Sequence, residues 1–223
     1  MRNIILAMCL SIIVSVACVP FSVRGWGVAI ARGTFTFFVM NVWGYWVHRI
    51  SHSEWGKSVP LLRLHALLHH REGCDEHAEP GKLWGILHTE DVLLEAAGNI
   101  FFIGVLVWVF RAIVPGVHHL LSVRGIAFYT LSYTAIHNFN YHLPAYSDFH
   151  SKHHKHPQYN HGVCLMDAMF GTCLPGDTPE DMTHYIPTMA IVACVIVIVC
   201  SYRPKTLENT SKLEDFLAQS RTM

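Results

Sequence analysis

The stretch GVAIARGTFTFFVMNVWGYWVHRISH, which runs from Gly27 to His52, joins an apolar segment directly to a pair of histidines. The part that ends at Val47 provides the roughly 20 residues that a helix needs to cross a bilayer. His48 and His52 are four residues apart, so on a continued helix they project from the same face. The stretch therefore predicts a membrane helix that carries two imidazoles out of the bilayer.

The composition of the chain is that of a membrane protein. Of its 223 residues, 52% are hydrophobic and 14% are charged, and the mean hydropathy is +0.31. This length allows one domain. The formal net charge is zero, which excludes the basic field that a nucleic-acid partner would need. The seven cysteines form no C-x-x-C pair and suit small buried residues in a reducing compartment.

Four other apolar segments are candidates for membrane helices. Val92–Phe110 and Leu120–Ile136 are joined by a short turn and predict a transmembrane hairpin over residues 92–136. Ile4–Val19 fits an anchor or a cleaved signal peptide, and the anchor is favoured because it suits the topology of the later segments. Ile186–Tyr202 is short and is followed by basic residues, which favours a position against the protein or the interface over a fifth crossing.

The expected fold is an all-α integral membrane protein with four transmembrane helices, or five if residues 186–202 cross, and a histidine-rich di-metal cap. Its expected parts are N-terminal membrane helices (1–44), a metal-binding domain that includes the hairpin (45–185), and an apolar segment with a polar tail (186–223).

The polar stretches 48–91 and 137–185 leave the membrane on the same side, because a hairpin separates them. Eight lysines and arginines lie on that side against three on the other, which predicts that the polar stretches are cytoplasmic.

Histidine is the residue type that needs an explanation in this chain. The 17 histidines outnumber the 16 carboxylates, and most of them lie in the two polar stretches. Neutral imidazole is a good ligand for iron, zinc and copper. One histidine pair at helical spacing is typical of a solvated helix face, but three clusters on one side of a membrane favour a metal centre. Eight histidines are more than one ion can bind, which indicates two ions. The clusters are His48 and His52; His65, His69 and His70; and His150, His153 and His154.

The order of the motifs YWVHRISH, HALLHH, HSKHH and NHGVCLMDAMFGT resembles the fatty acid hydroxylase/sterol desaturase superfamily. The nearest likeness is to sterol C5-desaturases of the lathosterol oxidase type. The resemblance covers roughly Tyr45–Thr172, more than half of the chain. One departure is that Asn160-His161-Gly162 stands where the family has Asn-Tyr-Gly.

The resemblance implies a di-iron centre, in which zinc can replace iron in purified material. It implies the eight clustered histidines and His137 as ligands. It leaves the contributions of His142 and His161 open and suggests an outer role for His88. Asp167 would either contact a ligand or brace the polar layer, and bracing is favoured. The family also implies the endoplasmic reticulum membrane, O2 as a substrate, and electrons from a separate cytochrome b5-type donor.

The expected activity is hydroxylation or desaturation of a membrane lipid, with a sterol favoured by the spacing of the last motif. Two alternatives stay open on the sequence. One is a hydroxylase of fatty acyl chains or sphingolipids. The other is a non-enzymatic metal-binding or metal-transporting membrane protein, against which stands the lack of a histidine or aspartate near the middle of any apolar segment.

Overall fold

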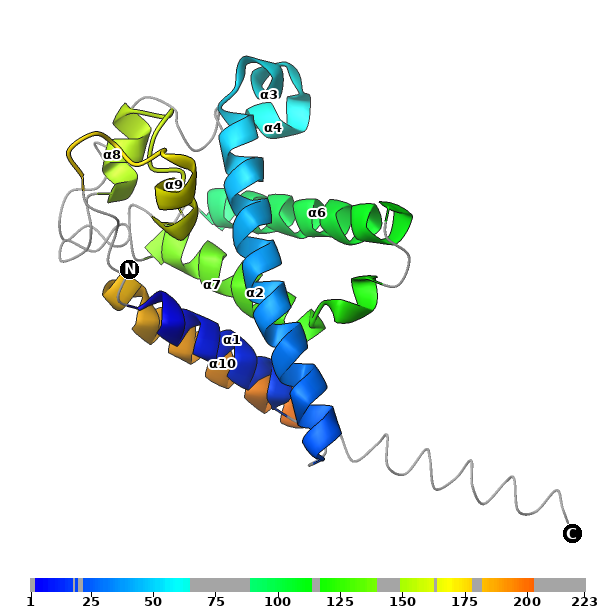
Figure 1. Cartoon of the computed structure of the whole chain (residues 1–223). Helices are drawn as coiled ribbons and strands as arrows, with labels where there is room; N and C mark the ends of the chain where they lie inside the picture. Colours follow the sequence, from blue (N-terminus) through cyan, green and yellow to red (C-terminus); the bar gives the residue numbers. More distant parts are fainter. Residues whose placement is uncertain are drawn as a thin grey trace, which may run out of the picture.

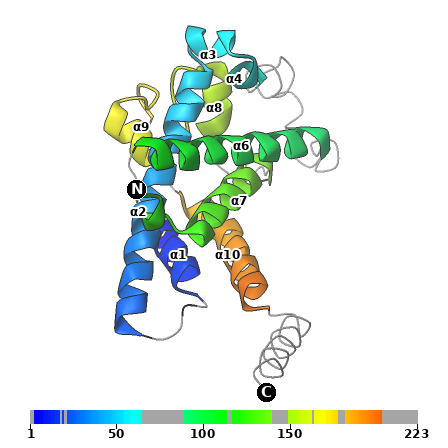
Figure 2. The same cartoon turned by 90° about the vertical axis from the view of Figure 1, so that its right-hand side faces the viewer.

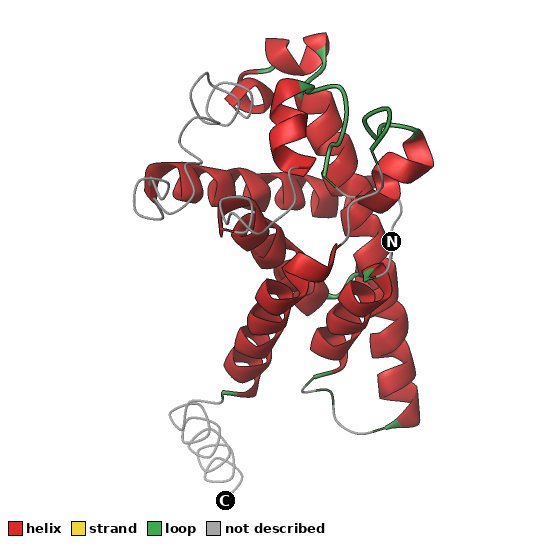
Figure 3. Ribbon diagram, turned by 90° about the vertical axis from the view of Figure 1, so that its left-hand side faces the viewer, coloured by secondary structure: helices red, strands yellow, loops and turns green. Residues whose placement is uncertain are grey.

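The computed structural model describes residues 3–17, 19, 22–64, 89–113, 117–139, 149–162, 164–177 and 182–202. Every regular element in these ranges is helical, which confirms the all-α expectation (Figures 1 and 3). The elements are α1 (Ile4–Val16), α2 (Val23–Ser51), α3 (Glu54–Ser58), α4 (Pro60–Leu64), α6 (Thr89–Ile113), η2 (Val117–Leu120), α7 (Val123–Phe139), α8 (Phe149–Lys155), α9 (Cys164–Phe170), η4 (Met182–Tyr185) and α10 (Ile186–Ser201).

The long helix α2 connects the two halves of the structure. Its first half packs with α1 and α7, and α10 packs against α1 and α7, so that α1 and α10 lie side by side (Figures 1 and 2). Its last turns lie beside α8 and α9, and α3 and α4 follow at its end. Helix α6 crosses α2, and the indole Nε1 of Trp43 donates a hydrogen bond to the carbonyl of Phe102 at the crossing, 3.1 Å away. The site described below therefore lies at one end of a helical bundle.

The main core lies between α1, α2, α7 and α10. It is apolar, because each helix turns one row of hydrophobic side chains towards the others. The buried residues of this core are Ala7, Val14, Phe37, Phe128, Tyr185, Met189, Ala193 and Ile196. A second, smaller core joins α2 to α9 through Tyr45 and Met166, which are 0% and 1% exposed.

A seam of small residues lets α1, α2 and α7 approach closely. A Cβ atom added at Gly33 would lie 2.9 Å from the Ser15 hydroxyl, and one added at Gly125 would lie 3.2 Å from the Thr36 methyl group. The Ser15 and Ser122 hydroxyls are 2.8 Å apart across the same seam. Close packing of small residues with hydrogen bonds between helices is the usual way in which helices associate in lipid.

One helix is long and apolar enough to cross a membrane in the part of the chain that the structure describes. It is the 19-residue stretch Thr183–Ser201. The expected four spans are therefore not confirmed: Ile4–Val16 and Ala96–Phe110 are apolar but shorter. Short length was one of the two arguments against a crossing by residues 186–202, and the structure removes that one because η4 continues directly into α10. The basic residues that follow still favour a position against the protein or the interface.

The outer faces of α6 and α10 carry exposed hydrophobic side chains. Trp108 and Ile113 on α6 are 68% and 72% exposed, and Ile191 and Ile198 on α10 are 65% and 67% exposed. Contact of such faces with lipid costs little free energy, whereas their contact with water is unfavourable. These faces agree with the membrane association that the composition predicts.

Candidate metal centre

The first two histidines of the site come from the end of α2. Residues three or four apart share a helix face, and His48 and His52 accordingly lie together, with ring centroids 5.1 Å apart. His48 is 6% exposed, and His52 is the residue that caps the C-terminus of the helix. The prediction that α2 carries both imidazoles on one face is confirmed.

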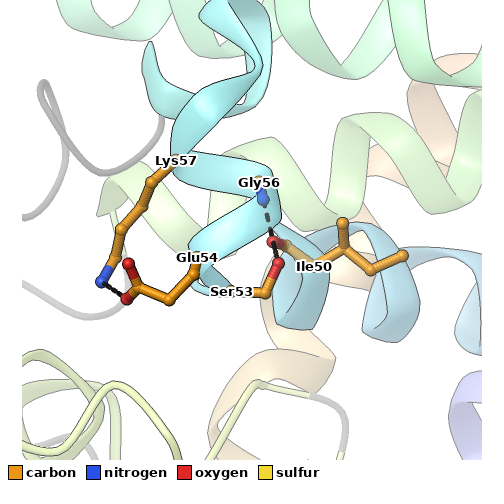
Figure 4. Close-up of polar contacts among 5 residues, drawn as sticks. All are labelled: Ile50, Ser53, Glu54, Gly56 and Lys57. Carbon is orange, nitrogen blue, oxygen red and sulfur yellow. Dashed lines mark hydrogen bonds and ion pairs between the residues drawn. The ribbon is translucent and has the colours of Figure 1, made fainter.

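A tight turn after His52 fixes the point at which α2 ends. The Ser53 hydroxyl donates to the carbonyl of Ile50 at 2.6 Å and accepts the amide N–H of Gly56 at 3.0 Å (Figure 4). Ser53 thereby caps the N-terminus of α3, a role that serine favours. On the outside of the turn, Lys57 pairs with Glu54 at 2.7 Å. The last turn of α2 is thus tied to the next helix through the carbonyl of Ile50.

Gly56 is required by this turn, and its replacement gives a testable prediction. A Cβ atom there would lie 1.9 Å from the carbonyl oxygen of Ile50, so Gly56→Ala must open the turn next to His52. We expect a loss of about 1–3 kcal/mol in the free energy of unfolding, as for other overpacked sites, together with weaker metal binding. The control is Gly27→Ala on α2, which has no neighbour within 4 Å and should be neutral or stabilising. Equal thermal stability of the two variants would contradict this account of the turn.

The third histidine comes from α8, about a hundred positions later in the chain. His153 is 0% exposed, and its ring centroid lies 4.6 Å from that of His48 and 4.8 Å from that of His52. One donor atom from each of the three residues lies within 4.8 Å of the other two, so this group could hold a metal ion. It joins the first and third histidine clusters, which the sequence predicted would meet.

The separation of two ring nitrogens fits a shared ion. Nε2 of His52 and Nε2 of His153 are 3.1 Å apart. Two imidazole nitrogens on one ion lie about 2.9 Å apart at a right angle and about 3.4 Å apart at a tetrahedral angle, given metal–nitrogen bonds near 2.0–2.1 Å. An ion could therefore replace the proton between these nitrogens with little movement of either ring.

Backbone carbonyls orient two of the three rings. Nδ1 of His48 lies 2.6 Å from the carbonyl oxygen of His161, and Nδ1 of His153 lies 2.6 Å from that of Tyr159. A carbonyl oxygen can only accept, so each Nδ1 carries the proton and each Nε2 carries the lone pair. Metal-binding histidines commonly have such an outer hydrogen bond, because it fixes the tautomer and the direction of the ring.

The loop that supplies the His161 carbonyl is held by a buried carboxylate. Asp167 is 0% exposed, and its two oxygens accept the amide N–H groups of His161 and Gly162, both at 3.0 Å. The Thr172 hydroxyl donates to Asp167 at 2.7 Å and lies 3.0 Å from the Tyr45 hydroxyl. The prediction that Asp167 braces the polar layer is confirmed, and the brace reaches His48 through one peptide group.

Two residues of this loop have left-handed backbone conformations. Asn160 has φ of 53° and Gly162 has φ of 87°. Asparagine is one of the few residues that tolerate this region, and here its side chain accepts the amide N–H of Leu174 at 2.9 Å. The Asn-His-Gly sequence therefore has a backbone role on each side of His161.

Burial keeps the site histidines neutral. It lowers the pKa of His52 from 6.5 to about 4 and that of His153 to about 2. Burial, and then the nearby Arg49 guanidinium, lower the pKa of His161 to about 4. A metal ligand must be deprotonated, so protons compete less for these rings than for exposed histidines.

These pKa shifts predict how the stability of the metal-free protein depends on pH. The unfolded chain binds protons at His52, His153 and His161 near pH 6.5, whereas the folded chain stays neutral there until about pH 4 or below. Where the unfolded state binds more protons than the folded state, the free energy of unfolding decreases as the pH is lowered. We therefore expect the unfolding temperature in detergent to decrease as the pH is lowered from about 7 to about 5, a range in which most carboxylates are still ionised. A constant unfolding temperature over that range would contradict the burial of neutral rings.

The remaining predicted ligands have different positions. His137 is buried in α7, where it stacks on Tyr133 with centroids 5.5 Å apart, and it is not one of the three grouped residues. The His154 ring lies 6.1 Å from that of His153 and is half-buried. His150 lies on α8, but its side chain is not among those described. Outside the described residues lie His65, His69, His70, His88 and His142.

A fourth imidazole lies beside the group of three. His161 is 3% exposed, and its ring centroid is 5.5 Å from that of His153 and 5.8 Å from that of His48. The sequence left its contribution open. The signal for it was a histidine at a position where the family that the motifs resemble has tyrosine.

Comparison of the chain with protein-family models, with curated proteins and with solved structures gives no match.

Proposed function

We propose that the chain is a membrane-bound, O2-dependent lipid hydroxylase or desaturase with a histidine-ligated iron centre. The observation that carries the proposal is the meeting of His48 and His52 with His153, within 4.8 Å, at one end of a bundle with apolar outer faces. The motif resemblance supplies the reaction class, two iron ions as the expected metal content, and a cytochrome b5-type donor in the endoplasmic reticulum membrane. Iron in such a site would supply the O2 activation that attack on an unactivated C–H bond requires.

The chain's own residues would prepare the site for that chemistry. His48 and His153 direct Nε2 inward, because their Nδ1–H groups are held by backbone carbonyls. The low pKa of His52 leaves this ligand neutral across the physiological pH range. His48 and His153 are buried and His52 is half-buried, which excludes most water and protects a reactive centre from side reactions.

An aromatic path from the site to the surface favours an apolar substrate. The Tyr45 ring lies 5.7 Å from the His161 ring and stacks on Phe170 at 5.0 Å. Phe170 and Trp46 are 42% and 38% exposed, and the neighbouring Met169 is 65% exposed. The exposed end of this aromatic cluster is an aromatic and thioether surface that suits lipid carbons, whereas a polar substrate would gain little there. A sterol is the first candidate, and a fatty acyl chain or sphingolipid is the second.

Lipid analysis in the presence of labelled oxygen tests the proposal. The full chain, expressed in yeast strains of defined sterol and sphingolipid content with a competent electron donor, should change one lipid class. Labelled oxygen in the product indicates hydroxylation, and a new double bond without label indicates desaturation. His153→Ala is the inactive control. A bound metal without any change in the lipid profile would reject the enzyme in favour of a metal-binding or transport protein.

A further inference from the structure

His161 has the burial of a ligand and an unsatisfied ring nitrogen. Only 3% of the residue is exposed, and its Nδ1 has no hydrogen-bond partner in the part of the chain that the structure describes. A neutral imidazole with its proton on Nε2 presents a lone pair at Nδ1. A buried polar atom of this kind calls for a partner such as an ion or an ordered water.

The four rings have the separations of ligands around one ion. A metal-bound imidazole has its centroid about 3.2 Å from the ion, so two rings at a tetrahedral angle are about 5.2 Å apart. The six separations among His48, His52, His153 and His161 range from 4.6 to 6.1 Å. The three that involve His161 are the longest, at 5.5, 5.8 and 6.1 Å. His161 thus lies at the fourth corner of a distorted tetrahedron, slightly too far out.

We propose that His161 is a fourth ligand of the ion held by His48, His52 and His153, and that it binds through Nδ1. The inference depends on the metal centre proposed above. The ring would move towards the other three when the ion binds, by rotation about its side-chain bonds. The backbone need not follow, because Asp167 holds the amide groups of His161 and Gly162.

His161 would then contribute to the metal centre in two ways. The carbonyl of His161 accepts the Nδ1–H of His48 and so orients one ligand, while the side chain of His161 supplies another. The Asp167 brace would therefore position two of the four nitrogen donors. This arrangement makes the loop between α8 and α9 a part of the metal centre itself.

Cobalt substitution of the metal-free full chain in detergent tests this role. His161→Phe retains an aromatic ring against Tyr45 but removes both nitrogens. We expect its affinity for Co²⁺ to fall at least about tenfold, which is the loss that even outer partners of metal ligands cause. We also expect one fewer paramagnetically shifted, exchangeable imidazole N–H signal in its proton NMR spectrum. The control is His156→Ala, an exposed histidine on the same side of the protein, which should change neither quantity.

The outcomes separate the two proposals. If the wild-type chain binds Co²⁺ and His161→Phe gives the same number of imidazole signals, the role of His161 is wrong and the metal centre stands. If the wild-type chain binds neither Co²⁺ nor Fe²⁺, both are wrong. Should His161→Phe fail to fold, as judged from its thermal unfolding, the same signal count on His161→Gln decides the question.

Discussion

His153→Ala should remove the metal from the site and abolish lipid turnover. His153 is the sole grouped ligand that α8 contributes among the described residues, and it is 0% exposed. Its loss leaves only His48 and His52 of the three grouped imidazoles. Purified wild-type protein is expected to contain close to two metal ions per chain, and the variant should contain at least one fewer. Elemental analysis after anaerobic reconstitution with iron measures the count, because zinc can enter the site during expression.

The control for this experiment is His156→Ala, three residues further along the chain. His156 is exposed, so its loss should leave metal content and turnover unchanged. Removal of a buried imidazole also leaves a cavity, which costs stability, so His153→Gln is measured beside His153→Ala. If both His153 variants fold and keep the wild-type metal content, the proposed centre is incorrect.

Asp167→Asn should cause a large loss of stability, although it replaces no predicted ligand. Both carboxylate oxygens accept backbone N–H groups, and an asparagine would direct its own NH2 group at one of these donors. Hydrogen bonds to a charged group contribute about 1.5–3 kcal/mol each, and buried donors left unpaired add a further penalty. We therefore expect a loss of about 3–5 kcal/mol in the free energy of unfolding, measured by denaturation of the metal-free protein in detergent.

The same substitution should weaken metal binding without removing a ligand. When the loop moves, the carbonyl of His161 no longer fixes Nδ1 of His48, and losses of this kind cost roughly 10- to 100-fold in metal affinity. Thr172→Val is the matched control, because it removes one hydroxyl donor to the same carboxylate and should cost only about 1–2 kcal/mol. An Asp167→Asn protein with wild-type stability would show that the carboxylate is not the brace of the loop.

Local sequence patterns were sufficient where neighbours along one helix decide the geometry. The four-residue spacing of His48 and His52 fixes their shared face in any α-helix, and the apolar segment before them predicts α2. Segment length was less reliable. The sequence placed residues 186–202 at the lower limit of length for a crossing, whereas helical structure begins at Met182 and makes this the longest apolar helix described. A 3-10 turn that continues into an α-helix leaves no hydrophobic signal of its own.

The sequence by itself determined that the protein is helical, apolar and rich in histidines at helical spacing. Only the tertiary structure decided which histidines meet. His153 joins His48 and His52 because α8 lies beside the end of α2, while His137 stacks on Tyr133 within α7 and His161 becomes a neighbour of the group. The spacing of residues along the sequence indicates which side chains share a face of one helix. Which faces of different helices come into contact depends on how the helices pack. The position of His161 depends further on an Asp167 carboxylate and two left-handed residues, which act through the backbone and have no period to detect.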